Sequence, residues 1–161
     1  MNWICATVAF CISFTPLKME YSNKEEFIQQ ARACVIWYNN QWEPSMRVPW
    51  KLAVAQSIQE SDYGTSYFAE EANNLMGIKE FDETEPHIKP RNRPNADWGV
   101  KIFNNKCESM MFYIDLLNDN HHYEEFRDER LNQYIKDEAD LDKLAKTLAI
   151  YAEDVYYPSK I

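Results

Sequence analysis

Leu52–Lys79 reads LAVAQSIQESDYGTSYFAEEANNLMGIK, and this stretch decides the fold. Its first part is a nearly apolar helical run that ends in a carboxylate, followed by a turn, a short helical pattern and an Asn-Asn step into a strand. A helix that is apolar on most faces should be buried. Its polar residues share one narrow side: Gln56, Gln59 and Glu60. An unpaired buried carboxylate costs on the order of several kcal/mol or becomes neutral, so Glu60 is either catalytic or a structural acid with a partner.

Helices are predicted on both sides of this stretch from capping residues and apolar spacing. Asn23 and Asn105 are each followed three residues on by a glutamate, which is typical of a helix start. Proline suits a first helical position, as at Pro49. The predicted helices begin at about Asn23, Pro49, Thr65 or Ser66, Asn105, Tyr123 and Asp140, and the one from Tyr123 should end near Leu131.

Two short strands, 75–79 and 97–103, are predicted from alternating apolar residues and should form a hairpin. Their connection, 80–96, is rich in proline and charge, so it should be a mobile surface loop of the kind that lines binding sites. A chain of 161 residues is long enough for one domain with a core. The sequence therefore predicts one mainly α domain, of the α+β kind, with a small β-hairpin lobe.

The N-terminal residues 3–14, WICATVAFCISF, are apolar and have the length of a signal-peptide core, too short to span a bilayer. No Lys or Arg precedes them and no small-x-small cleavage site follows. Residues 1–22 are interpreted as an export signal or an uncleaved anchor, with a packed N-terminal segment as the alternative, and 23–161 as the domain. We expect the protein to be exported to the periplasm, the cell envelope or the medium, with no other membrane span.

Charge and cysteine content limit the partners. The net charge is −9 and no basic run exceeds a dipeptide, which argues against nucleic acid; an anionic polymer would have to be held through sugars, stacking and hydrogen bonds. There is no CxxC, and the three histidines lack ligand spacing, so neither a metal nor a cofactor is expected. Cys34 and Cys107 could form a disulfide in an exported protein or stay as two buried thiols.

The central stretch resembles the AQ…ESGWGTS…A…NNLFGIK signature of the bacterial glucosaminidases that cut peptidoglycan, glycoside hydrolase family 73, including its Bax-type members. The chain end is similar to the family's YATD…Y…I close. The matching residues are Ala55-Gln56, Glu60-Ser61, Gly64-Thr65-Ser66, Ala69, Asn73-Asn74-Leu75, Gly77-Ile78-Lys79, and Tyr151-Ala152-Glu153-Asp154 with Tyr157 and Ile161.

This resemblance implies a lysozyme-like fold, with a glycan cleft between a helical bundle and the hairpin lobe, and it implies that Glu60 is the general acid. A helix end among apolar and aromatic groups supplies the desolvation that raises the pKa of such an acid. Tyr151 is the expected polar partner across the cleft, or else a core tyrosine with a satisfied hydroxyl. The expected sugar-binding residues are Gln56, Tyr63, Asn74, Met76 and Trp98.

The sequence departs from the family pattern near the expected acid. Asp62 replaces the usual glycine and adds a charge that should raise the pKa of Glu60. Tyr63 replaces the usual tryptophan, and Met76 stands where an aromatic residue is common; both keep an apolar surface. Ser57 and Ser61 are interpreted as hydrogen-bonding residues at the helix end.

The second carboxylate is the larger departure, because Gly99 occupies the position where the family places it. Asp97 is the nearest acid on that strand. Substrate assistance by the N-acetyl group is a third route. Further candidates lie on the long connection: Glu80, Asp82, Glu83 and Glu85.

The resulting hypothesis is an exported hydrolase of the β-1,4 bond between N-acetylglucosamine and N-acetylmuramic acid in peptidoglycan, with Glu60 as general acid. A lytic transglycosylase, which also uses one glutamate before a serine but forms an anhydro sugar, is the close alternative. A non-catalytic glycan-binding domain of the same fold is the second. The oligomeric state is left open.

Overall fold

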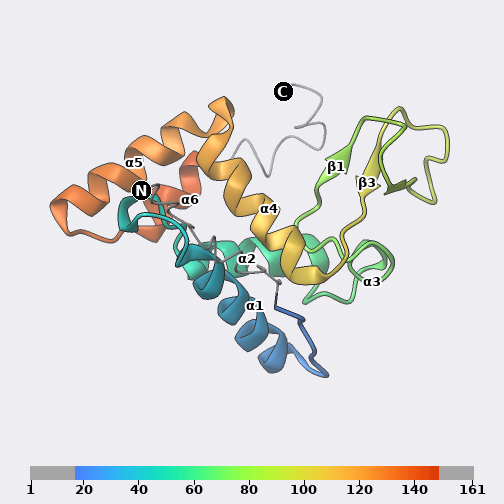
Figure 1. Ribbon diagram of the computed structural model, residues 1–161, viewed down its shortest axis with the longest axis horizontal. Helices are drawn as coiled ribbons and strands as arrows, with labels where there is room; N and C mark the ends of the chain where they lie inside the picture. Colours follow the sequence, from blue (N-terminus) through green and yellow to red (C-terminus); the bar gives the residue numbers. More distant parts are fainter. Residues whose placement is uncertain (1–16, 149–161) are drawn as a thin grey trace, which may run out of the picture.

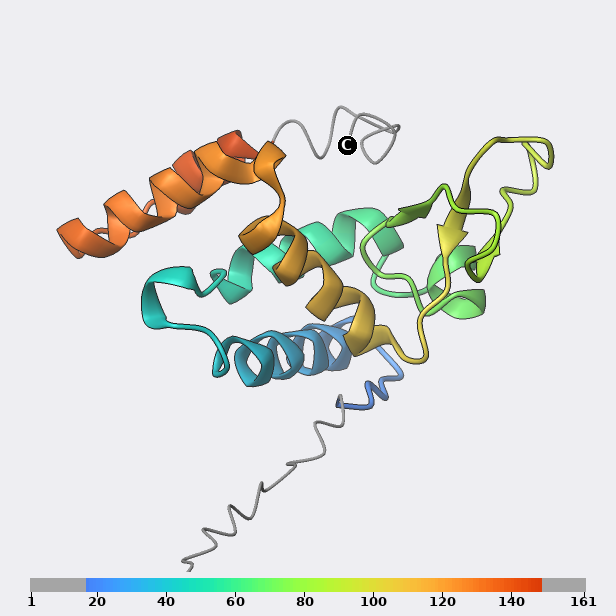
Figure 2. The ribbon, with the colours of Figure 1, turned by 45° about the horizontal axis from the view of Figure 1, so that its top comes forward.

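The computed structural model describes residues 17–148, which fold into a mainly helical domain with one small sheet (Figure 1). This confirms the predicted fold class. Figures 1 and 2 show α1, α2 and α4 crossing in the middle, α3 and the sheet at one end, and α5 and α6 at the other. The helices are α1 (Lys24–Asn39), η1 (Pro44–Met46), α2 (Trp50–Ser61), α3 (Tyr67–Glu71), α4 (Lys106–Asp119), η2 (His121–Tyr123), α5 (Glu124–Lys136) and α6 (Leu141–Thr147), and the strands are β1 (Lys79–Glu80), β2 (His87–Ile88) and β3 (Gly99–Lys101).

Side-chain caps begin four helices at the predicted residues. Each cap accepts a hydrogen bond from the backbone N–H three residues further on, which satisfies a donor that the helix leaves unpaired. The caps are Asn23, Ser66, Asn105 and Asp140, at 2.9, 3.3, 3.1 and 2.9 Å. Helix α2 begins one residue later than predicted, since Pro49 is its N-cap, and α5 runs to Lys136.

Helix α2 is buried on fewer faces than predicted. Lys51, Ala55 and Gln59 are exposed, and their spacing of four residues places them along one line on the solvent side. The apolar residues Leu52 and Val54 are buried. The sequence predicts apolar, buried faces round most of this helix, but the small apolar side chain of Ala55 lies in the exposed line. Gln56 and Glu60, which directly follow the exposed residues Ala55 and Gln59, are therefore half-buried at the border between core and solvent.

The predicted hairpin is a three-stranded antiparallel sheet in the order β1-β3-β2. The expected pairing of the first and last strands is confirmed. The connection 80–96 was predicted as a mobile loop, but it contains β2, which pairs with the free edge of β3. The aligned pairs are Lys79↔Val100 and Glu80↔Gly99 between β1 and β3, and His87↔Lys101 and Ile88↔Val100 between β2 and β3.

Residues 74–78 form a turn, although the sequence predicts a strand from 75. The Asn74 side chain explains the difference. Its Nδ2 donates to the carbonyls of Ile78 (2.8 Å) and Lys101 (2.9 Å), and its Oδ1 accepts from the N–H of Ile78 (3.0 Å) and Met76 (3.3 Å). These bonds replace the ladder that a neighbouring strand would provide, so the backbone curls and only enters the sheet at Lys79.

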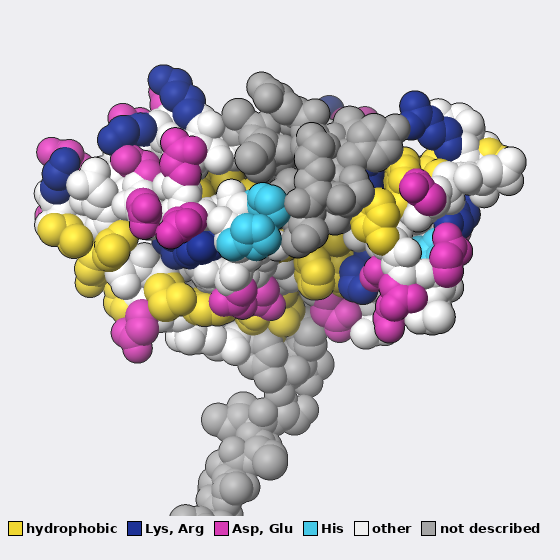
Figure 3. Space-filling view, turned by 90° about the horizontal axis from the view of Figure 1, so that it is seen from above, with side chains coloured by type: hydrophobic (Ala, Val, Ile, Leu, Met, Phe, Trp, Pro, Cys, Tyr) yellow, Lys and Arg dark blue, Asp and Glu magenta, His cyan; other side chains and the backbone are white. Residues whose placement is uncertain are grey.

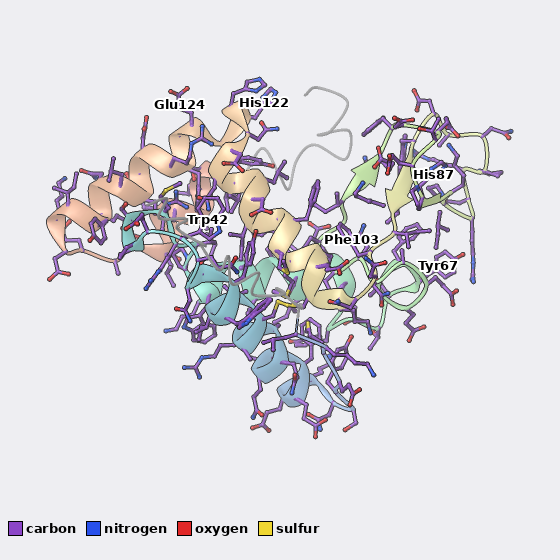
Figure 4. The ribbon with its side chains drawn as sticks, in the orientation of Figure 1. Trp42, Tyr67, His87, Phe103, His122 and Glu124 are labelled. Atoms are coloured by element: carbon purple, nitrogen blue, oxygen red, sulfur yellow. A yellow bond between two sulfur atoms is a disulfide. The ribbon has the colours of Figure 1, made fainter. Side chains whose placement is uncertain are left out.

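A disulfide joins Cys34 on α1 to Cys107 on α4 (Figure 4). Both residues are fully buried in the main core. Of the two alternatives, the disulfide is therefore confirmed. It joins residues 73 positions apart, and in the chain-entropy treatment a loop of that length adds about 4 kcal/mol to the free energy of unfolding.

The segment that precedes α1 packs against the domain. Met19 is buried in the main core, and the Tyr21 hydroxyl donates to the Gly64 carbonyl at 3.1 Å and accepts from Lys106 Nζ at 2.6 Å. Residues near the end of the predicted segment 1–22 therefore pack against the domain. Within residues 17–148, no helix combines the length and apolar character that crossing a membrane requires.

Candidate active site

Glu60 lies in the last turn of α2, at the border between core and solvent. Gln56, one turn earlier, donates from Nε2 to Glu60 Oε1 at 3.0 Å. Burial raises the pKa of the Glu60 carboxyl, and the hydrogen bond from Gln56 only partly opposes this. Glu60 therefore keeps its proton to a higher pH than an ordinary glutamate, as a general acid must.

The other oxygen of Glu60 faces the backbone of the 74–78 turn. Gly77 has φ +65°, and a Cβ added to it would lie 2.8 Å from Glu60 Oε2. An L-residue is therefore disfavoured here both by its backbone and by the space that the carboxylate occupies. The turn built by Asn74 and the end of α2 thus meet at this carboxylate.

Tyr113 on α4 is a third neighbour of Glu60, and the sequence analysis missed it. Its side chain is fully buried. Burial, together with the nearby charge of Glu60, raises the pKa of the Tyr113 hydroxyl. In the sequence, Tyr113 falls among apolar residues at helical spacing, which predicts an ordinary core residue. Its place beside Glu60 follows only from the packing of α4 near α2. Three elements, α2, the 74–78 turn and α4, therefore surround the carboxylate.

The end of α2 is shaped by two serines and by backbone in the left-handed region. Ser61 Oγ donates to the Ser57 carbonyl at 2.5 Å and accepts from the Gly64 N–H at 2.9 Å, and Ser57 Oγ donates to the Val54 carbonyl at 2.7 Å, which confirms the hydrogen-bonding role of both serines. Asp62, Tyr63 and Gly64 have φ of 47°, 57° and 74°. These turn the chain out of α2 directly after the site.

Asp62 does not act on Glu60 as predicted. Its side chain is exposed at the left-handed C-cap, close to the Thr65 hydroxyl, and burial and Gln56 account for the shifted pKa of Glu60. The expected rise caused by Asp62 is wrong, because water screens an exposed charge. The same backbone explains the family's glycine, since glycine adopts this conformation without strain.

The predicted sugar-binding residues fall into two groups. Gln56 contacts Glu60, and Tyr63 is partly exposed, with its ring 6.0 Å from that of Phe27 and Lys24 Nζ 4.3 Å from its centroid. Their contact with sugar stays a prediction. The remaining three are buried, so the structure gives them supporting positions and not a surface for a ligand: Asn74 (2% exposed), Met76 (0%) and Trp98 (8%).

The carboxylates proposed as the second acid differ in their surroundings. Asp97 is exposed in the bend before β3, as are Asp82, Glu83 and Glu85 on the connection. Glu80 has a side chain only 15% exposed, which faces Lys101 Nζ at 2.6 Å. Tyr151 lies outside the described residues.

Gly99, at the position where the family places a carboxylate, is covered by the imidazole of His87. A Cβ at Gly99 would lie 2.7 Å from His87 Cγ. Within residues 17–148 no group of three or more His, Cys, Asp or Glu side chains gathers as a metal ion would require.

The family model of the glucosaminidases, described as mannosyl-glycoprotein endo-beta-N-acetylglucosaminidase, matches residues 36–161. This range contains α2 with Glu60 and the whole sheet, and it covers most of the chain. The fold and the match define a glycoside hydrolase family, and the chain belongs to it: it is a member of the glucosaminidases, glycoside hydrolase family 73. Comparison with curated proteins and with solved structures gave no match.

Proposed function

We propose that this protein is an exported peptidoglycan hydrolase that cleaves the β-1,4 bond between N-acetylglucosamine and N-acetylmuramic acid. The observation that carries the proposal is Glu60, a half-buried acid at a helix end whose two oxygens face Gln56 and Gly77. Family membership supports glycosidase chemistry on N-acetylglucosamine.

Glu60 acts as the general acid. The burial that raises its pKa keeps it protonated to a higher pH than an ordinary glutamate, and its proton passes to the glycosidic oxygen as the bond from C1 breaks. Gln56 donates to Oε1 and so fixes the rotation of the carboxyl group. The turn at Gly77 limits movement of the other oxygen. Positioning of this kind lowers the entropy lost in reaching the transition state.

The surface charge fits a substrate that is recognised through its sugars. The net charge is −9, and on the face in Figure 3 the acidic and basic side chains of the described residues are interspersed. An anionic polymer would gain little from long-range attraction to such a surface. Hydrogen bonds and ring stacking, with Tyr63 and Tyr151 as the proposed aromatic groups, would hold the glycan in a cleft between the sheet and the helices.

Export is supported by two observations. The buried disulfide between Cys34 and Cys107 belongs to an oxidising compartment, since cytosolic thiols are kept reduced. The apolar segment 3–14 has the length of a signal core. Peptidoglycan lies in the compartment to which such a signal leads.

Digestion of isolated cell wall tests the proposal. New reducing N-acetylglucosamine ends would support hydrolysis, anhydromuramic ends would instead support a lytic transglycosylase, and pull-down without cleavage a binding domain. Glu60→Gln should lower the cleavage rate at least about 100-fold, while Gln59→Ala, an exposed change in the same helical turn, should leave it unchanged. If Glu60→Gln stayed within about threefold of the parent, a barrier change under about 1 kcal/mol, Glu60 would not be the acid.

A further inference from the structure

We propose that Glu80, on β1, supplies the second carboxylate of the reaction, in place of the one that is missing at Gly99. The role is that of an ionised group that stabilises the positive charge developing at C1 of the sugar. This inference rests on the proposed hydrolase function and adds a residue to its site.

The strand register places Glu80 directly across from Gly99. Aligned residues of antiparallel strands point to the same face, with Cβ atoms about 4.5–5.5 Å apart. The imidazole of His87 covers Gly99, so β3 has no room for a side chain at that position. Glu80 is therefore the carboxylate that reaches the same part of the sheet face from the neighbouring strand.

This face of the sheet points toward α4, whereas Val100 and Ile88 on the other face pack with Phe68 of α3. Side chains alternate along a strand, so Lys101 shares a face of β3 with Gly99, and therefore with Glu80 on β1. Lys101 Nζ lies 5.8 Å from the ring of Phe112 on α4, and Phe103, just after β3, is buried in the main core with its ring 5.7 Å from that of Phe112. Figure 4 shows Phe103 where the lobe meets α4. Glu80 thus lies on the face of the sheet that is directed toward α4.

Chain connectivity limits the distance between Glu80 and the turn that faces Glu60. Gly77 contacts the Glu60 carboxylate, and three residues of extended chain span at most about 11 Å between the Cα atoms of Gly77 and Glu80. The next residue on α4 after Phe112 is Tyr113, the buried neighbour of Glu60. The Glu60 carboxylate and the Lys101 ammonium group that pairs with Glu80 therefore lie near successive residues of α4, Tyr113 and Phe112.

The surroundings of Glu80 suit a carboxylate that stays ionised. Oε2 accepts from Lys101 Nζ at 2.6 Å, and Oε1 accepts from the N–H groups of Phe81 (3.0 Å) and Asp82 (3.1 Å). Burial alone would raise the pKa of Glu80, but these donors together lower it. The pKa of Glu60 is shifted in the opposite direction. Carboxyls with pKa values pushed apart are the pattern expected of a general acid and its charged partner.

The two groups divide the reaction between them. Glu60 gives its proton to the leaving oxygen, and the C1–O bond breaks with its electron pair going to that oxygen. The cationic charge on C1 and the ring oxygen is stabilised by Glu80. Water then adds its hydroxyl to C1, and its remaining proton restores the acid form of Glu60. One water is consumed for each bond broken.

The test compares Glu80→Gln with the parent on isolated peptidoglycan. We expect kcat to fall about 100-fold or more with KM within about threefold, because the lost charge acts in the transition state. The matched control is Glu129→Gln on α5, which removes an ion-paired carboxylate of similar exposure: 14% against 15%, with Lys143 at 2.8 Å. The control should keep the parent's kcat.

A second readout separates a catalytic charge from a structural one. In the parent, kcat/KM should fall at acid pH as Glu80 is protonated and at alkaline pH as Glu60 ionises. Glu80→Gln should lose only the acid limb, and formate added to Glu80→Ala should restore activity at least about tenfold, because it replaces the missing carboxylate.

The outcomes also separate the two proposals. A parent that cleaves, with Glu80→Gln within about threefold and its acid limb retained, would overturn the role of Glu80 and leave the hydrolase standing. Low activity of Glu80→Gln that formate does not restore in Glu80→Ala, with melting temperatures below the parent's, would also overturn it in favour of a structural role. A parent that leaves the wall intact would overturn the proposed function itself.

Discussion

Replacing Gly77 with alanine tests the contact between the 74–78 turn and the Glu60 carboxylate. Gly77 has φ +65°, a conformation that costs an L-residue about 1–2 kcal/mol. In a domain of this size that corresponds to a fall in Tm of about 2–8 °C. The added methyl would also lie 2.8 Å from Glu60 Oε2, which is closer than Cβ atoms in proteins approach other atoms. The carboxylate therefore has to move by several tenths of an ångström. A shift approaching 1 Å at a reacting group lowers the rate up to about 100-fold.

The assay is the release of reducing ends from isolated wall, with thermal unfolding measured in parallel. We expect kcat of Gly77→Ala to fall about 10- to 100-fold. The control is Asp137→Ala: Asp137 is exposed at the C-cap of α5 with φ 54°, so alanine there meets the same backbone conformation away from Glu60. It should lose stability and keep its activity. A Gly77→Ala protein with kcat within twofold of the parent, about 0.4 kcal/mol, would refute the reasoning.

Two further variants test the surroundings of Glu60. Glu60→Gln should raise Tm relative to the parent at neutral pH. Because the folded-state pKa of Glu60 is raised, the stability that its protonated form contributes is complete below the unfolded pKa, near 4.5, and is lost as the pH rises through the folded-state pKa. Glutamine does not ionise, so the variant does not lose this stability. A Tm difference of the opposite sign would contradict the burial of this group. Asn74→Ala should lose about 3 kcal/mol in urea unfolding, since it leaves buried backbone groups unpaired. Asn132→Ala on α5 serves as control, and an equal loss there would contradict the role of Asn74.

Local signals predicted the helix starts well. A cap acts on a backbone N–H three residues away, so the residues that decide a start at Asn23, Ser66 or Asn105 lie next to one another in the sequence. The position of Glu60 at a helix end could also be predicted from neighbouring residues, because the apolar helical run ends there and Gly64 follows in the turn. The family resemblance then added a chemical role that periodicity alone left open.

The parts that could not be predicted depend on partners far along the chain. The turn at 74–78 follows from a side chain that bonds Lys101, and β2 is a two-residue strand that exists only because β3 offers it an edge. The imidazole over Gly99 comes from that same strand. Tyr113 reads as core by its spacing, and only helix packing shows that it neighbours Glu60. Each is a contact between elements, which neither propensity nor spacing encodes.

The disulfide has a consequence for the proteolysis of this domain. The covalent loop between Cys34 and Cys107 contains α2, the 74–78 turn and the whole sheet, and therefore both Glu60 and Glu80. A single cut in the exposed connection near Arg91 would leave its two products joined through the sulfurs. Because Cys34 and Cys107 are fully buried, a nicked protein remains one molecule, with both carboxylates, until it unfolds far enough for a reductant to enter.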